Sequence, residues 1–226
     1  MAQGTDIMRS ADDVLLLIDL QYDFMPGGAL AVAHGDEVVP VANRLAQAFS
    51  HVVLTQDWHP AQHVSFAASH AGRQPFETIA LPYGEQVLWP THCVQGTAGA
   101  DLHRDLHVPH ARAIIRKGHH ADVDSYSAFL EADRATPTGL SGYLRETGAN
   151  GGAHGGVKRV YCCGLATDYC VAWSALDARA AGFEAVLIED ASRAIDLNGS
   201  LAAAWEQLRA AGVKRAQSAE VLRGAA

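Results

Sequence analysis

The sequence predicts an α/β protein with a single doubly wound, mostly parallel sheet that carries helices on both faces. The chain has 226 residues, 49% of them hydrophobic, and apolar runs of strand length alternate with stretches of helical period. A soluble chain of this length and composition can bury one well-packed core. Parallel strands need crossover connections, which are usually helical, so the alternation indicates a parallel sheet.

Five apolar runs are predicted strands and three stretches are predicted helices. The strands are 14–19 (VLLLID), 51–56 (HVVLTQ), 111–117 (ARAIIRK), 157–164 (VKRVYCCG) and 184–190 (EAVLIED). The helices are 36–49, 168–182 and 200–212, of which the last two end at glycine, as helices often do. Asp36 is the predicted cap of the first helix, and Pro40 lies near its first turn, where proline is tolerated.

The remaining segments fit one domain, residues 1–226, with residues 1–12 as a flexible N-terminal tail. Residues 57–110 show little periodicity and are predicted to form a long ordered excursion over the strand ends, where functional loops concentrate. The glycine-rich stretch 148–156 (GANGGAHGG) follows no strand, so it is interpreted as a surface connection rather than a phosphate-binding loop.

Charge and composition exclude several classes of partner. A formal net charge of -8 argues against nucleic acid and against an anionic membrane surface, because both favour a basic patch. The early apolar run VLLLI is too short for a signal segment or a membrane span. Four cysteines, two of them adjacent, do not form a disulfide framework. We therefore expect a cytoplasmic protein with free thiols.

Side chains able to do chemistry follow the predicted strands. Asp19 closes the first strand, Asp57 follows the second, Lys117 closes the third, and Cys170 comes shortly after the fourth. In an open parallel sheet the carboxyl ends of the strands face one crevice, which is the usual ligand site. The sequence therefore predicts that these four side chains meet there.

Cys170 ends the stretch GLATDYC, where a helix is predicted to begin. With Thr167 as the N-cap, Cys170 occupies the first turn, where free backbone N–H groups and the helix dipole favour a thiolate. Backbone N–H groups of Ala166 and Cys170 are candidates to bind an oxyanion. The alternative interpretation is a buried helical cysteine without a chemical role.

Asp19 and Lys117 each end an apolar strand, and burying a charge is costly unless it is paired or used. Together with Cys170 they suit an amidase. Asp19 would accept the thiol proton and return it to the leaving amine, while Lys117 would hold Asp19 and the developing charge. The alternative is a structural ion pair of Asp19 and Lys117. Cys93 is a rival nucleophile, but no helix start near it would lower its pKa.

A second group of residues suits a metal ion. Asp57 and His59 lie two apart, so in an extended loop they point the same way, and His92 from the excursion would complete the set. One carboxylate and two imidazoles suit zinc, iron or manganese. His63 is a candidate fourth ligand.

The other histidines and cysteines have less specific interpretations. His119 and His120 are interpreted as an ordinary solvated pair.

An alternative from another protein class is a catalytically silent module in which Cys162, Cys163 and Cys170 join histidines around zinc. The chain has no C-x-x-C pair, and adjacent cysteines on a strand point to opposite faces, so the pattern does not favour this module.

Five segments carry a resemblance to a known family. They are 15–30 (LLLIDLQYDFMPGGAL), 56–66 (QDWHPAQHVSF), 88–97 (LWPTHCVQGT), 116–118 (RKG) and 164–178 (GLATDYCVAWSALDA). In this order they resemble the nicotinamidase/pyrazinamidase branch of the isochorismatase-like cysteine hydrolases, over about residues 14 to 200. The resemblance implies the doubly wound fold and a catalytic triad of Asp19, Lys117 and Cys170.

The resemblance also implies a divalent metal ion, with zinc ahead of iron or manganese, on Asp57, His59 and His92. In this family the metal binds the ring nitrogen of the substrate and does not activate a water molecule. A cis peptide bond is implied between Leu165 and Ala166, just before the oxyanion donor.

Members of this family enclose the pyridine ring of the substrate with aromatic side chains. The resemblance implies this role for Phe24, Trp89 and Tyr126. Core packing is the alternative role for each of them. Residues 119–156 depart from the family pattern, and their role is left open.

The implied function is the metal-dependent conversion of nicotinamide and water to nicotinate and ammonia through a cysteine thioester, in NAD salvage. Pyrazinamide is an expected second substrate. The alternative is a related cysteine amidase that acts on another small carboxamide. No nucleic acid or membrane partner is expected, and a homo-oligomer is left open.

Overall fold

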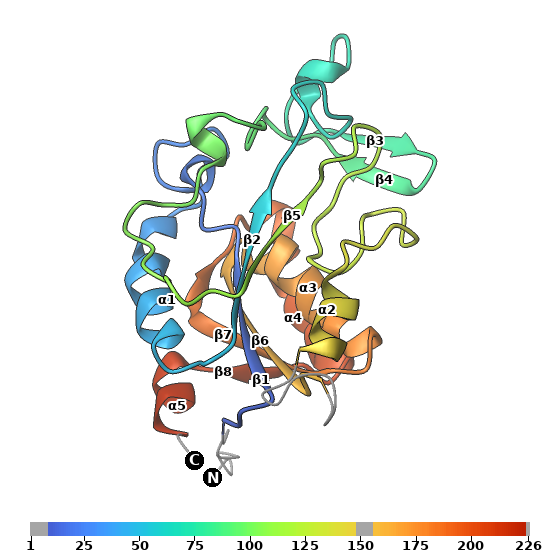
Figure 1. Cartoon of the computed structure of the whole chain (residues 1–226). Coiled ribbons are helices and arrows are strands. Elements are labelled where there is room, and N and C mark those ends of the chain that lie inside the picture. Colours follow the sequence, from blue (N-terminus) through green and yellow to red (C-terminus); the bar gives the residue numbers. More distant parts are fainter. Residues whose placement is uncertain (1–8, 148–155, 225–226) are drawn as a thin grey trace.

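A computed structural model describes residues 9–147 and 156–224 and contains a six-stranded sheet with helices on both faces (Figure 1). The strand order is β5-β2-β1-β6-β7-β8, and every neighbouring pair is parallel, which confirms the predicted fold class. The strands are β1 Asp13–Ile18, β2 Val52–Asp57, β5 Ala113–Lys117, β6 Arg159–Leu165, β7 Glu184–Arg193 and β8 Lys214–Ala216.

The helices divide between the two faces of this sheet. In Figure 1, α1 and α5 lie on one side of the sheet, and α2, α3 and α4 lie on the other. Their bounds are α1 Val38–Ala46, α2 Leu140–Glu146, α3 Ala172–Ala180, α4 Ser200–Ala210 and α5 Ser218–Arg223. This two-sided cover is what makes the central strands apolar on both faces.

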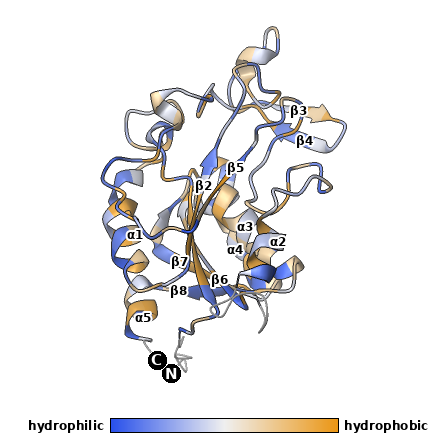
Figure 2. Cartoon of the chain, in the orientation of Figure 1, coloured by the Kyte–Doolittle hydropathy of each residue, from blue (hydrophilic) through white to orange (hydrophobic). Residues whose placement is uncertain are grey.

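Strand β1 shows how the sequence builds both halves of the core. Leu15 and Leu17 pack into the cluster that contains α1 and α5, whereas Leu16 and Ile18 pack into the cluster of α2, α3 and α4. Successive side chains of a strand point to opposite faces, so a continuous apolar run fills two cores. Figure 2 shows the centre of the sheet largely in the hydrophobic colour.

All five predicted strands and all three predicted helices are present, with ends that differ by a few residues. The sequence analysis missed α2, α5, β8 and the antiparallel hairpin of β3 (Thr78–Leu81) and β4 (Gly84–Val87). These elements are short, and β3, β4 and β8 are largely exposed, so they lack the apolar runs that mark the central strands. A capping box of Gln217 and Glu220 was the available signal for α5.

Two predicted helix caps are wrong. Asp36 lies inside a 3₁₀ turn, Gly35–Glu37, and α1 begins at Val38 without a side-chain cap, because the turn itself supplies backbone bonds at the helix start. Thr167 is also not an N-cap. That position belongs to Ala166, and Thr167–Val171 forms a π-helical turn that leads into α3.

The long excursion of residues 57–110 crosses the carboxyl ends of the strands, at the top of Figure 1, together with the β3–β4 hairpin. At the opposite end of the molecule, the N–H of Arg9 donates to the carbonyl of Gly224 at 2.8 Å. Residues 1–8 of the predicted tail and residues 148–155 of the glycine-rich stretch lie outside the described residues. None of the described helices has the length and apolar character needed to span a membrane.

Candidate active site

The structure brings the three predicted catalytic side chains together at the carboxyl ends of the strands. Asp19 follows β1 directly, with a φ of 53°; Lys117 is the last residue of β5, and Cys170 lies in the π-helical turn after β6. The ammonium nitrogen of Lys117 lies 2.9 Å from Asp19 Oδ2 and 3.3 Å from Cys170 Sγ. Three distant segments of the chain thus contribute to one polar cluster.

Asp19 is fully buried and held at one of its two carboxylate oxygens. The hydroxyl of Thr55 donates to Oδ1 at 2.5 Å. Oδ2 lies at ion-pair distance from Lys117, but no donor among the described residues is oriented to make a hydrogen bond to it. Burial raises the pKa of Asp19, and the Asp57 charge adds to this effect while the Lys117 ammonium opposes it. Oδ2 is therefore an available proton acceptor.

Cys170 is buried, 6% exposed, and lies next to two carboxylates. Burial raises the pKa of the Cys170 thiol well above its usual value; Asp19 and Asp57 raise it further, and Lys117 opposes them. In this arrangement of protein groups, burial and the two carboxylates oppose the thiolate that a helix start is predicted to favour. A protonated thiol needs a base, and two carboxylates are adjacent. Asp57 accepts a hydrogen bond from Lys117, whereas Asp19 Oδ2 accepts none from the described residues, so Asp19 is the better candidate.

Lys117 connects the catalytic cluster to the predicted metal ligands. Besides Asp19 and Cys170, its ammonium donates to the carboxylate of Asp57 and to the carbonyl of Ser125. Burial alone would lower the pKa of Lys117, but the charges of Asp19 and Asp57 raise it well above its usual value. The amine stays charged, and its contacts extend beyond the simple Asp19–Lys117 ion pair considered as an alternative.

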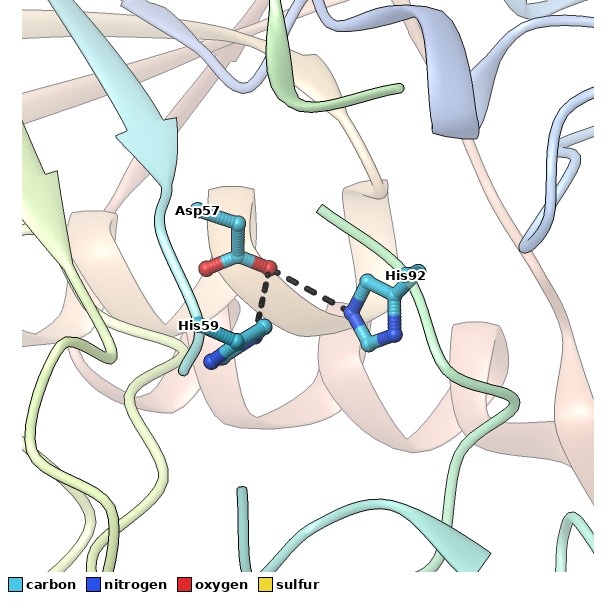
Figure 3. A group of neighbouring side chains, drawn as sticks. All are labelled: Asp57, His59 and His92. Carbon is cyan, nitrogen blue, oxygen red and sulfur yellow. Dashed lines mark ion pairs between the residues drawn. The ribbon is translucent and has the colours of Figure 1, made fainter. Parts of the chain in front are cut away.

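The three predicted metal ligands converge on one point (Figure 3). Asp57 Oδ2 lies 3.5 Å from His59 Nε2 and 3.6 Å from His92 Nε2. Burial alone would raise the pKa of Asp57, but the Lys117 ammonium lowers it well below the usual value, so the carboxylate is ionised. An ionised carboxylate and two imidazoles are a suitable ligand set for a divalent metal ion.

The outer nitrogens of both imidazoles fix the direction of the inner ones. His59 Nδ1 lies 2.9 Å from the carbonyl oxygen of Gly118, and His92 Nδ1 lies 2.7 Å from that of Pro90. A carbonyl accepts, so each Nδ1 carries the proton and each Nε2 offers a lone pair toward Asp57. This orientation is an observation of the fold itself and fits a metal site.

His63 packs against His59 but does not face Asp57. The ring centroids of His59 and His63 are 4.2 Å apart. Both nitrogens of His63 have protein partners, since Nδ1 lies 2.7 Å from the hydroxyl of Ser65 and Nε2 lies 3.1 Å from the carbonyl of Val123. In this arrangement His63 supports the ring of His59, and its ligand atom lies near those of His59 and Asp124 rather than in the group of Asp57 and His92.

A small cavity lies between Cys170 and the predicted metal ligands. Cys170 and Ala166 line it on one side, and the metal ligands line it on another. The predicted aromatic residues Phe24, Trp89 and Tyr126 are all part of its wall. The indole N–H of Trp89 donates to the hydroxyl of Tyr126 at 3.0 Å, which fixes the two rings nearly perpendicular to each other.

Sequence reasoning missed several residues of this site. Asp124 and Tyr169 also line the cavity, and Thr55 supports Asp19. Asp124 lies two residues before Tyr126, and Tyr169 precedes Cys170, so proximity to predicted site residues was the available signal. Thr55 could have been noticed as the hydroxyl side chain that interrupts the apolar run of the predicted strand, VVLTQ.

The structure also bears on two other predictions, the cis peptide bond before Ala166 and the alternative roles of the other cysteines. The peptide bond between Leu165 and Ala166 is cis, as the resemblance implies. Cys93 is fully buried, and burial raises the pKa of its thiol well above the usual value, so it is a poor nucleophile. Cys162 and Cys163 pack into opposite cores, which contradicts a zinc module that uses both.

Comparison with known proteins agrees with this geometry. Residues 13–220 match the model of the isochorismatase domain. The chain belongs to the isochorismatase family. This family member is 53% identical over 216 residues to a nicotinamidase of Acinetobacter baylyi, with 95% of the present chain and 97% of the relative covered.

Solved structures extend the likeness of this isochorismatase-family chain. A nicotinamidase/pyrazinamidase of Acinetobacter baumanii superposes with a TM-score of 0.90 at 55% identity, covering 95% of this chain and 100% of that one. A pyrazinamidase of Pyrococcus horikoshii, solved in complex with zinc, gives a TM-score of 0.71 at 37% identity, covering 91% and 99%.

Proposed function

We propose that this chain is a nicotinamidase, which converts nicotinamide and water to nicotinate and ammonia and also hydrolyses pyrazinamide. One observation carries the proposal: Cys170 and the set of Asp57, His59 and His92 line the same cavity. A ligand in this cavity can present a ring nitrogen to the metal site while its carboxamide faces the thiol. The similarity to nicotinamidases over nearly the whole chain supports the same activity.

The residues of the site account for an acyl-transfer mechanism. Asp19 Oδ2 accepts the proton of Cys170, and the sulfur attacks the carboxamide carbon to form a tetrahedral intermediate. Backbone N–H groups of Ala166 and Cys170 bind its oxyanion, while Lys117 balances the charge of Asp19. Asp19 then returns the proton to the leaving nitrogen as the C–N bond breaks, which releases ammonia and leaves a thioester.

The second half of the reaction uses the same base. Asp19 accepts a proton from a water molecule whose oxygen attacks the thioester carbon. The C–S bond breaks, the acid product leaves, and the proton returns to Cys170. The hydroxyl of the water molecule is added to the acid product and its other hydrogen goes to the thiol. The protein therefore ends in its starting state.

Asp57, His59 and His92 would hold the divalent ion, and we propose zinc ahead of iron or manganese. Zinc suits this combination of imidazoles and carboxylate, and the Pyrococcus horikoshii relative was solved with zinc. When bound, such an ion supplies a Lewis acid that can coordinate a pyridine or pyrazine nitrogen. Phe24, Trp89 and Tyr126 would enclose the ring.

The proposal extends to the cellular setting. We propose a cytoplasmic enzyme of NAD salvage, built as a single domain of residues 1–226, that acts on small molecules and not on nucleic acid or membranes. A homo-oligomer is compatible with this function. A related amidase acting on another small carboxamide is the alternative function.

An assay of ammonia release tests the proposal directly. Purified protein of measured metal content is incubated with nicotinamide, pyrazinamide, benzamide and an aliphatic carboxamide. We expect the two ring-nitrogen substrates to have much higher kcat/KM than benzamide, which has the same ring size without the nitrogen. Equal rates with benzamide would contradict the role of the metal group, and turnover of the aliphatic amide alone would favour the alternative amidase.

A further inference from the structure

A second group of potential metal ligands lies outside the cavity, at the segment that follows β5. Glu131 is 1% exposed, and both of its carboxylate oxygens lie 2.9 Å from Nδ1 of His120. Among the residues that the structure describes, this one imidazole nitrogen provides the hydrogen bonds to the carboxylate. A carboxylate has lone pairs for about four such contacts, and a buried one is costly without strong partners. Glu131 therefore has unused capacity to bind a cation.

His119 adds a third donor beside His120. The ring centroids of the two histidines are 4.1 Å apart, although neighbouring side chains in an extended chain point to opposite sides. The turn at Gly118, with a φ of +66°, precedes the pair and marks the departure from the extended chain. Ligand atoms of His119, His120 and Glu131 all lie within 4.8 Å of one another. The expectation of an ordinary solvated pair therefore describes the exposure of these histidines but misses their convergence on Glu131.

We propose that His119, His120 and Glu131 form a second metal site, which binds a divalent transition-metal ion of the zinc type. Two imidazoles and one carboxylate are the donor set that zinc prefers, whereas magnesium and calcium prefer oxygen ligands alone. Both histidines are exposed, so their rings can rotate to close the distances, and Glu131 is fixed by burial. The fourth position of a tetrahedral ion would face solvent.

The position of this site in the chain gives it a structural consequence. The segment 120–131 includes Asp124 and Tyr126, which line the cavity, and the new ligands stand at both of its ends. An ion on His120 and Glu131 would join the ends of that segment. Binding at this site is therefore expected to stabilise the folded protein and the cavity wall.

Equilibrium dialysis of the untagged protein against zinc chloride, followed by elemental analysis, tests the proposal. We expect two zinc equivalents on the unaltered protein and one on His120→Ala and on Glu131→Gln. His34→Ala is the matched control, because His34 pairs with Glu37 at 3.0 Å on an exposed surface where the described part of the chain offers no third ligand. This control should keep two equivalents.

Two further measurements separate the new site from the site in the cavity. His92→Ala should keep one equivalent, and the double variant of His92 and His120 should keep none. A second equivalent of zinc should raise the Tm of the unaltered protein but not that of His120→Ala. Two equivalents on His120→Ala, or a single equivalent on the unaltered protein that His120→Ala retains, would overturn the proposal whether or not the protein hydrolyses nicotinamide.

Discussion

The proposed catalytic group (Asp19, Lys117 and Cys170) and the proposed metal group (Asp57, His59 and His92) meet at one cavity, which Cys170 and the metal group line, but the two groups are built in different ways. Asp19, Lys117 and Cys170 lie at or just beyond the ends of sheet strands, so the pairing of the strands sets their separation. In the metal group, Asp57 also ends a strand and pairs with Lys117 across β2 and β5. His59 and His92 instead come from the excursion and are aimed by single contacts to backbone carbonyls.

This difference separates the two tasks of the site. In the proposed mechanism, the sheet holds the reacting groups, for which a small displacement is costly, while the loops hold two of the residues that would bind the metal ion and orient the ring. The Asp57–Lys117 ion pair joins the two regions. We therefore expect substitutions in the catalytic group mainly to lower kcat, and substitutions in the metal group mainly to raise KM.

The largest effect is expected from Cys170→Ala. Without the nucleophile no thioester can form, so kcat for nicotinamide should fall by at least about 10⁴-fold. Binding of nicotinamide should persist, because the metal ligands and aromatic walls are untouched. Ammonia release and calorimetric binding check the two parts. Cys162→Ala, which alters a buried cysteine outside the cavity, is the control; ammonia release by Cys170→Ala close to that of the control would refute the mechanism.

Asp19→Asn should have the next largest effect. The amide keeps the shape of the side chain but cannot accept the thiol proton, and kcat should fall by about 10² to 10⁴-fold. The buried thiol should also become less reactive, which an iodoacetamide alkylation rate measures. Asp36→Asn, at a site remote from the cavity, should behave like the unaltered protein. Full activity in Asp19→Asn would assign the base to another group.

His92→Ala tests the other side of the comparison. Loss of one ligand should weaken metal affinity by at least about 10- to 100-fold, and KM for nicotinamide should rise more than kcat falls. Chelation of the unaltered protein should have the same effect and be reversed by zinc. Metal content and steady-state kinetics check this, with the exposed His107→Ala as control. A fall in kcat alone would show that the two groups do not divide the work as proposed.

The smallest effect concerns stability at the amino end of the sheet, away from both groups. His51 is buried, and burial together with the charge of Arg112 lowers its pKa from 6.5 to about 4. Between these values the unfolded chain binds more protons than the folded one, so stability should be full above pH 6.5 and fall as the pH drops toward 4.

Thermal unfolding at several pH values measures this dependence. His51→Gln should show a shallower loss of Tm between pH 6.5 and 4, with normal kcat and KM at neutral pH. An unchanged pH profile would mean that other groups control acid stability, and altered kinetics would mean that the two ends of the sheet are not independent.

Much of the central sheet and the candidate site followed from the sequence because both depend on local patterns. Long apolar runs marked the strands, and Asp19 and Lys117 stood out as charges at their ends. The short hairpin, β8 and α5 escaped because they are held by neighbouring elements rather than by apolar runs of their own. Asp124 escaped because nothing local distinguishes its carboxylate from a solvated one.

By itself the sequence determined the fold class, the set of reactive residues and the family resemblance, since these rest on residue types, spacing and order along the chain. Only the tertiary structure shows that Cys170 is buried beside two carboxylates and which groups contact His63, because these partners come from other segments of the chain. It also decided that Glu131 meets His119 and His120. A sequence pattern does not contain the distances between segments that are far apart in the chain, or the extent to which a side chain is removed from water. Both are set only when the chain folds.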